Sequence, residues 1–265
     1  MRRLLSILAG AAVVLVVLAI LIIGVLRSTV NVYRITVIEG LTVAQMLDSL
    51  AGQTEFTVAE LTEPLLDGTV VSDLRIVDSQ ELRDWEGLLF PDTYEVTDRD
   101  EPAEILQRLA DTAESRVGSI DWSFLEEQGL TAHDGIVIAS MIEREAALDE
   151  DRPLIASVIF NRLEIGMPLQ IDATIVYALG GYPEGGLSLE DLKIDSPYNT
   201  YTMTGLPPTP ISGVRLASLT AAAFPADTEF IYYVLAGEDG SHAFTDDFDE
   251  FLRLQQQSRE NGIYP

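Results

Sequence analysis

The sequence predicts an α+β protein in three parts: a single N-terminal transmembrane helix in residues 1–30, a small strand–helix–helix–strand module in residues 31–98, and a larger mixed α+β domain in residues 99–265. Three observations predict this order. An uncharged apolar run opens the chain, short strand and helix patterns follow it, and longer amphipathic helices with a late hairpin pattern occupy the rest. One membrane-spanning element therefore precedes two folded units.

The first segment, Leu4–Leu26, contains no charged residue and is longer than the ~20 apolar residues that span a bilayer as a helix. Arg2 and Arg3 precede it and predict a cytoplasmic N-terminus, with everything after Arg27 outside. A cleaved signal peptide is the alternative, but its apolar region would be about 7–15 residues long and would end at a small-residue cleavage site. We therefore expect an uncleaved anchor in the cell (inner or plasma) membrane.

Charge and composition exclude several classes of function. The chain carries 43 acidic and 16 basic residues, for a net charge of −27, and the acids are scattered rather than clustered in a tail. Such a surface repels nucleic acid, so we expect no nucleic-acid partner. The chain has no cysteine, which removes disulfides, thiolate metal sites and cysteine nucleophiles.

The small module is predicted from local signals. Alternation over Arg34–Ile38 indicates a strand, and Thr42 is a suitable N-cap for a helix over Val43–Leu50. A second helix, interrupted near its proline, fits residues 57–68, and residues 86–96 read as a returning strand. A unit this small has little core of its own, so we expect it to pack on the next domain.

The larger domain shows helical periodicity first and strand patterns late. A proline-rich stretch, residues 196–213, excludes a regular element there. The predicted elements are helices over 101–117, Ile136–Leu148 with Asp134 as N-cap, 151–166, 218–227 and 246–261, and a hairpin from 230–237 and 242–246.

The sequence lacks the residues that several kinds of site require. His133 and His242 are the only histidines and are not at ligand spacing, so we expect no metal. No glycine-rich phosphate loop is present, and no nucleophile elbow supports a serine triad built on Ser140. We expect no cofactor.

Carboxylates remain as candidates. On a helix, Glu143 has small, mostly apolar neighbours, which would desolvate its carboxyl, raise its pKa and suit it to general acid catalysis. Glu145 lies about 200° further round the helix, so the two carboxyls do not form a pair. A glutamate near the end of a core helix is also often solvated or paired with an arginine, and the helix pattern alone leaves both interpretations open.

Polar residues gather in the later loops. Amides, hydroxyls and aromatic rings on loops stiffened by proline suit a neutral polyol such as a sugar, although ordinary turn chemistry explains the same residues. These residues are Gln170, Asp172, Thr174, Asn199, Thr200 and Tyr201.

Six stretches in the same order resemble the endolytic murein transglycosylase family, also called YceG-like, from about residue 35 to the C-terminus. They are EGLLFPDTYEV, ASMIEREA, VIFNRLEIGMPLQIDATIVYALG, SPYNTYTMTGLPPTPI, AAAFPADTEFIYYV and HAF. The resemblance implies a LysM-like fold for the small module and a catalytic role for the larger domain. One position departs from the family pattern, because Ala173 stands where a proline is usual.

The resemblance implies a membrane-anchored lyase that cuts the bond between N-acetylmuramic acid and N-acetylglucosamine within nascent peptidoglycan strands. Glu143, the first glutamate of its motif, would protonate the leaving oxygen and then deprotonate the C6 hydroxyl, which closes a 1,6-anhydro ring and ends strand elongation. Gln170, Asn199 and Tyr201 would position the sugar, and Asp172 would support them. The implied partners are glycan strands and cell-wall synthases.

Two other functions remain open. The chain could be a membrane-tethered scaffold that binds glycan for the synthases, with Glu143 structural. A pyridoxal-phosphate lyase would need a Schiff-base lysine, and Lys193 is the single lysine of the chain. An acidic domain outside the cytoplasm does not favour that chemistry.

Overall fold

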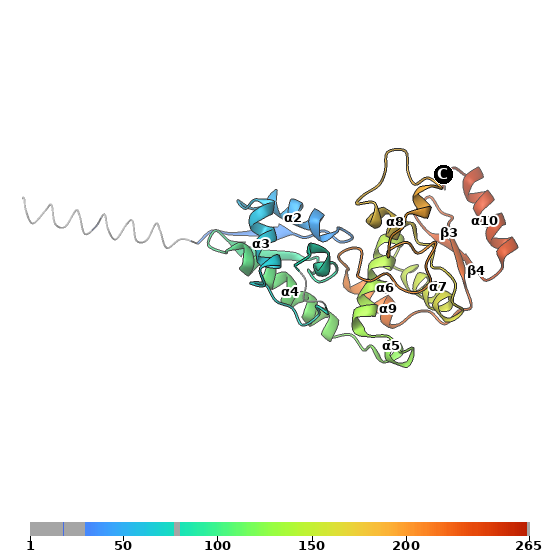
Figure 1. Cartoon of the computed structure of the whole chain (residues 1–265), viewed down its shortest axis with the longest axis horizontal. Helices are drawn as coiled ribbons and strands as arrows, with labels where there is room; N and C mark the ends of the chain where they lie inside the picture. The colour runs from blue at the N-terminus through green and yellow to red at the C-terminus, as the bar shows by residue number, and fades with distance from the viewer. Residues whose placement is uncertain (1–17, 19–29, 77–79, 264–265) are drawn as a thin grey trace, which may run out of the picture.

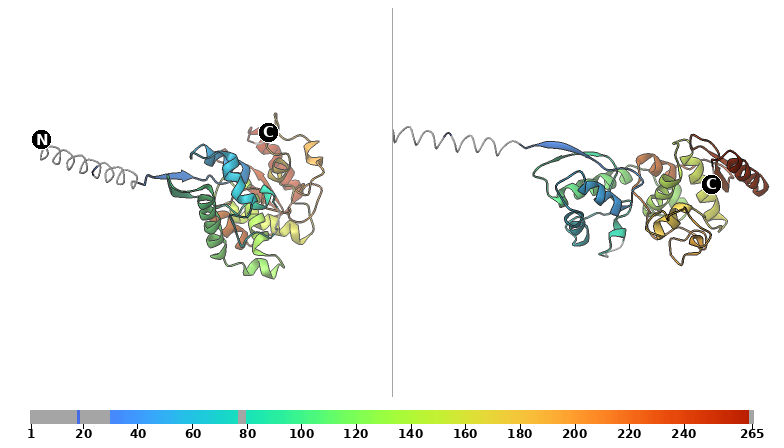
Figure 2. Two further views of the ribbon diagram at one scale, coloured as in Figure 1. Left: turned by 60° about the vertical axis from the view of Figure 1, so that its left-hand side comes forward. Right: turned by 90° about the horizontal axis from the view of Figure 1, so that it is seen from above.

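The computed structural model describes residue 18, residues 30–76 and residues 80–263. Two lobes lie side by side along its long axis, as Figures 1 and 2 show. Within the described residues, no helix is both long enough and apolar enough to cross a bilayer. The predicted transmembrane segment, Leu4–Leu26, lies outside the described residues apart from Leu18.

The N-terminal lobe contains the predicted strand–helix–helix–strand order, which is confirmed. Strand β1 (Val32–Thr36) pairs antiparallel with β2 (Thr93–Thr97), so Val32 lies opposite Thr97. Helices α2 (Val43–Ala51) and α3 (Val58–Leu66) separate the two strands in the chain and contact each other.

Local chemistry explains both helix starts in this lobe. Thr42 and Thr57 each accept a hydrogen bond through their side chains from the backbone N–H of the third helical residue, and the side chain of that residue accepts one from the backbone N–H of the threonine. The predicted break at Pro64 is wrong, because α3 continues through it. The predicted strand over residues 86–96 is shorter than expected, because a 3₁₀ turn, η1 (Leu82–Trp85), is followed by irregular chain up to residue 92.

Helix α4 (Pro102–Gly118) closes the N-terminal lobe by packing on α3 (Figure 1). It buries one apolar face, including Ile105, Leu109 and Ala113. The predicted helix is confirmed, and it lies beside the small module rather than among the helices that follow it. The short helix α5 (Ser123–Glu127) then leads to the C-terminal lobe.

The C-terminal lobe is built mainly of helices, with a hairpin at the far side. In chain order its elements are α6 (Ala132–Glu145), α7 (Arg152–Glu164), α8 (Asp172–Ala178), η2 (Asp191–Lys193), α9 (Leu216–Ala223), β3 (Tyr232–Leu235), β4 (His242–Thr245) and α10 (Phe248–Glu260). Helix α6 contacts α7, α8 and α9, which makes it the central helix of this lobe. The hairpin pairs Tyr232 with Thr245, and α10 packs on both strands. The predicted helices and hairpin are present, although α9 ends at Ala223 rather than at residue 227, and the proline-rich stretch has no helix or strand.

The two lobes share one hydrophobic core, as the small module's size led us to expect. Gly40 and Leu41, before α2, exchange backbone hydrogen bonds with Gly213 in the loop before α9, at 3.1 and 2.8 Å. Gly87 lies at φ +74°, and a Cβ there would come within 2.9 Å of Ile136 on α6. Because only glycine avoids both problems, this position lets the first lobe approach the central helix closely.

Candidate functional site

Helix α6 carries both carboxyls of the ASMIEREA stretch, and its ends differ from the prediction. Thr131, not Asp134, is the N-cap; Asp134 is the third helical residue, and its carboxylate accepts a hydrogen bond from the Thr131 backbone N–H at 2.8 Å. The helix ends at Glu145 rather than Leu148, because Ala146 is extended. Glu145 is therefore the last helical residue, and the chain turns away immediately after it.

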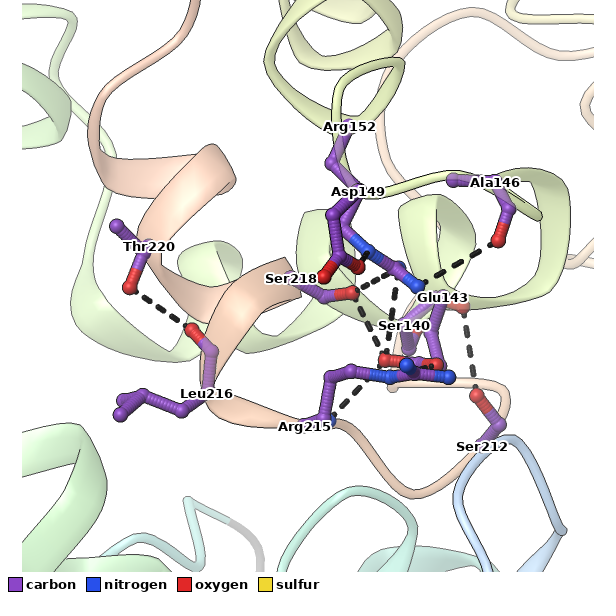
Figure 3. A network of polar contacts seen from close by, with 10 residues as sticks. All are labelled: Ser140, Glu143, Ala146, Asp149, Arg152, Ser212, Arg215, Leu216, Ser218 and Thr220. Carbon is purple, nitrogen blue, oxygen red and sulfur yellow. Dashed lines mark hydrogen bonds and ion pairs between the residues drawn. The ribbon is translucent and has the colours of Figure 1, made fainter. Parts of the chain in front are cut away.

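Glu143 is recessed, as predicted, but its surroundings are not apolar (Figure 3). Its side chain is 1% exposed and lies between two arginines. One carboxylate oxygen accepts from Arg215 Nε at 2.8 Å, and the other accepts from the Arg215 backbone N–H at 3.1 Å and from Ser218 Oγ at 2.8 Å. Arg152 Nη1 lies 3.7 Å from that second oxygen. The prediction of small apolar neighbours was wrong, because residues of α7 and α9, distant in sequence, supply these donors.

Arg152 extends this network and is itself 1% exposed. It donates to Ser218 Oγ at 2.6 Å and to Asp149 Oδ1 at 2.8 Å. The Glu143 network thus joins α6, α7 and the start of α9, the three helices that pack on one another in this lobe. Buried charges with this many partners are typical of a structural cross-link.

Glu145 faces another direction and has a different environment. Burial raises the pKa of its carboxyl to about 7, and the nearby negative charge of Asp172 adds to this rise. Tyr233 on β3 donates to Glu145 Oε2 at 3.1 Å, and the Ala173 backbone N–H also bonds the carboxyl; both lower the pKa, but by less than burial raises it. A carboxyl with this pKa exchanges protons readily near neutral pH.

The structure brings Asp172 and Tyr201 to the Glu145 side of α6. Asp172 is the first residue of α8, and its Oδ1 accepts a hydrogen bond from the Tyr201 hydroxyl. Arg162 donates to the carbonyls of Ile231 at 2.7 Å and Leu169 at 2.6 Å. It therefore links the start of β3 to the chain before α8.

Gln170 and Asn199 have different positions. Gln170 is exposed, lies at φ +52° and donates its backbone N–H to the Thr200 carbonyl at 2.9 Å. Asn199 is fully buried: its amide donates to the carbonyls of Leu192 and Ile194 at 3.1 and 2.7 Å, and its oxygen accepts from the Tyr201 N–H at 2.9 Å. Asn199 therefore shapes the loop that holds Tyr201 and does not present its amide to a ligand.

The residues considered for other chemistry lie elsewhere. Lys193 is exposed on η2 and pairs with Glu190 at 2.9 Å, which is unlike the enclosed lysine of a Schiff base. His242 Nδ1 lies 2.9 Å from Asp151 Oδ2 in a buried pair. No cluster of three or more metal-ligating side chains occurs among the described residues.

The sequence interpretation did not anticipate that Glu145 would lie beside Tyr233 and Asp172. Helical spacing separated Glu145 from Glu143 correctly, but it favoured Glu143, because it takes account only of neighbours on the same helix. The position of Glu145 at the end of the helix explains its contacts. Because no further helical turn follows Glu145, its carboxyl can contact β3 and α8. Tyr233 could be placed only once the hairpin was packed against α6.

Known proteins resemble this chain over most of its length. A protein of Bacillus subtilis named endolytic murein transglycosylase is 34% identical over 241 residues, which cover 87% of this chain and 66% of that protein. A protein of the same name from Streptococcus pneumoniae is 31% identical over 206 residues, 76% of this chain and 36% of its own length. This chain thus spans less than two thirds of either relative.

A crystal structure of a yceG-like protein from Listeria monocytogenes has the same fold, with a TM-score of 0.72 and 30% identity over 83% of this chain and 75% of that one. The model of the YceG-like family matches residues 17–257, which include both lobes and the Glu145 site. The chain therefore belongs to the YceG-like family.

Proposed function

We propose that this protein is an endolytic peptidoglycan lytic transglycosylase, a lyase that cuts within nascent glycan strands between N-acetylmuramic acid and N-acetylglucosamine and so ends their elongation. One observation carries the proposal: a half-buried carboxyl, Glu145, whose pKa is raised to about 7 and which is grouped with Asp172 and two tyrosines. The relatives named endolytic murein transglycosylase support the same activity.

We assign the acid to Glu145 rather than to Glu143. Both oxygens of Glu143 already accept hydrogen bonds from protein donors, including a guanidinium and a backbone N–H. A general acid must instead have a proton to give and a reacting atom within reach. Glu145 meets the first condition near neutral pH, and the polar side chains around it suit a sugar.

The reaction then needs one carboxyl. Glu145 donates its proton to the glycosidic oxygen, the bond from C1 of the muramic acid to that oxygen breaks, and N-acetylglucosamine leaves with a free hydroxyl. The C6 hydroxyl of the same muramic acid attacks C1, and the Glu145 carboxylate accepts its proton. The product carries a 1,6-anhydro ring and Glu145 regains its proton, so no water is consumed.

Asp172 supports a rival reaction, because its charge is close enough to act on Glu145. Two carboxyls around one bond are the usual arrangement of a glycoside hydrolase. Mass spectrometry of the fragments released from peptidoglycan by the full-length chain separates the two. We expect fragments ending in 1,6-anhydro-muramic acid. Reducing muramic acid ends would indicate hydrolysis, and binding without any fragments would indicate a glycan-binding scaffold.

The Asp172 charge predicts a shift in the pH profile. The cutting step needs protonated Glu145, so activity falls as pH rises through the pKa of that carboxyl. Replacing Asp172 by asparagine removes a negative charge that raises this pKa. We therefore expect the alkaline limb of kcat against pH to move to lower pH in Asp172→Asn.

The exposed Asp227 provides the matched control, since Asp227→Asn removes the same charge elsewhere on the lobe. An alkaline limb at an unchanged pH in Asp172→Asn would contradict the assignment of the acid.

The finer features of the protein belong to the same proposal. We infer that Leu4–Leu26 anchors the chain in the cell membrane with the two lobes outside, because that segment is long, apolar and preceded by arginines. We infer that the strand–helix–helix–strand unit is a LysM-like module that contacts glycan, and that cell-wall synthases are partners because they make the strand that is cut.

A further inference from the structure

A pocket of about 340 Å³ lies where the two lobes meet. The first lobe contributes the start of α2 and the η1 turn, and the second contributes the end of α6 and one side of α8. The lining side chains that bear on its chemistry are Gln45, Arg83, Glu86, Arg144 and Tyr177. Its volume lies in the range of pockets that enclose small ligands.

The pocket differs in charge from the rest of this acidic protein. Arg83 and Arg144 line it, from different lobes. Arg83 pairs with Glu81, and Arg144 donates one N–H to the Gly40 carbonyl at 2.8 Å, so each guanidinium keeps further donors. Burial raises the pKa of the carboxyl that lines the pocket, Glu86, to about 8, so that carboxyl is mostly uncharged at neutral pH.

The pocket also adjoins the proposed acid. Arg144 directly precedes Glu145 in the chain, and Ala173 lines the pocket while its backbone N–H bonds the Glu145 carboxyl. An occupant would therefore lie beside the sugar that Glu145 acts on. In peptidoglycan that sugar is muramic acid, whose lactyl group carries a short peptide stem with free carboxylates.

We propose that the pocket between the lobes binds a carboxylate of the peptide stem on the muramic acid being cleaved, with Arg83 and Arg144 as its counter-charges. This inference rests on the proposed function and adds a substrate requirement to it. Guanidinium groups match carboxylates in shape and charge, whereas a neutral sugar ring needs no cation. Since the net charge of −27 repels an anionic stem elsewhere, a cationic pocket gives the stem a defined place.

The test compares two substrates with the full-length chain. One is uncrosslinked glycan strands that keep their peptide stems, and the other is the same strands after an amidase has removed the stems. We expect wild type to cut stem-bearing strands with a lower KM. Arg83→Gln should raise KM about tenfold on stem-bearing strands, the effect of one charge-assisted hydrogen bond, and should leave KM on stripped strands unchanged.

Arg83 is the primary variant because it lies in the first lobe, away from Glu145 in the chain. Arg144→Gln should likewise raise KM on stem-bearing strands more than on stripped strands, although it also removes a charge that acts on Glu145. Arg34→Gln is the matched control, since Arg34 is exposed on β1 and does not line the pocket.

The outcomes separate this inference from the proposed function. Equal KM values of wild type on both substrates, or an equal rise on both in Arg83→Gln, would overturn the stem pocket and leave the transglycosylase in place. The second result would indicate a neutral sugar in the pocket. Release of nothing from either substrate by wild type would overturn the proposed function itself.

Direct binding gives a readout that does not depend on catalysis. The probe is the tripeptide L-alanyl-γ-D-glutamyl-L-lysine, compared by calorimetry with the same tripeptide amidated at every carboxyl. We expect wild type to bind the free acid more tightly, and Arg83→Gln to lose that preference. Equal affinity of wild type for both forms would contradict the inference.

Discussion

Replacing Glu145 by glutamine is expected to reduce the release of anhydro-muropeptides by at least ~10²-fold, since general acid–base catalysis contributes about that much or more. Glutamine keeps the shape of the side chain and can still accept from Tyr233, but it has no proton to give to the leaving oxygen. The fold should survive, because glutamine resembles the protonated acid that burial already favours at this position. Product analysis on peptidoglycan, with near-UV circular dichroism of the same sample, measures both quantities.

Glu150→Gln is the matched control for this experiment. Glu150 is exposed in the loop that follows α6, so the same substitution there should change neither activity nor fold. Near-normal product release from Glu145→Gln would remove Glu145 from the reaction.

Glu143→Gln is expected to act on stability. Removing one member of a buried ion pair costs about 3–5 kcal/mol, because the remaining charge stays buried without its partner. Here Arg152, 1% exposed, would keep Asp149 as its one acidic partner among the described residues, and the new amide would point a donor toward donors. For a chain of this length, such a loss lowers Tm by on the order of 10 °C. Thermal unfolding followed by circular dichroism measures it.

The two variants together decide between the carboxyls. If Glu143→Gln melts at the wild-type temperature and releases no product, Glu143 is the acid and our assignment is wrong. If it melts early but is active per folded molecule at low temperature, Glu143 is structural. The sequence interpretation of Glu143 as the acid predicts the first result, and the hydrogen bonds of its carboxylate predict the second.

Helices and strands were predicted well where they depend on interactions between residues close together in the sequence. The Thr42 cap, the amphipathic α4 and the hairpin near the C-terminus depend on residues a few positions apart, and each appears where expected. The predicted break at Pro64 was wrong, because α3 continues as a helix through this proline to Leu66. The end of α6 was misplaced by three residues, since Ala146, Ala147 and Leu148 carry no stop signal.

The site was harder to predict because its contacts cross the chain. Periodicity showed that Glu143 and Glu145 face different directions, but it did not show what each direction contains. Arg215 is 72 positions from Glu143, and Tyr233 is 88 positions from Glu145. The surroundings of Glu143 were predicted to be apolar because helical spacing identifies only neighbours on the same helix. Asp172 and Tyr201 were predicted as site residues from loop composition, and they lie near Glu145 rather than near Glu143.

The Glu143 network also predicts how mutations would affect the abundance of this protein in a cell. Mutations at the carboxyls of Glu143 and Glu145, which are separated by one residue, are expected to have different effects. A change in the cross-link between α6, α7 and α9 lowers the folded fraction, so proteases remove the chain and its abundance falls. A change at Glu145 leaves abundance normal and produces a stable, inactive protein that still occupies its substrate. Immunoblots of the two kinds of mutant would differ before any enzyme assay was run.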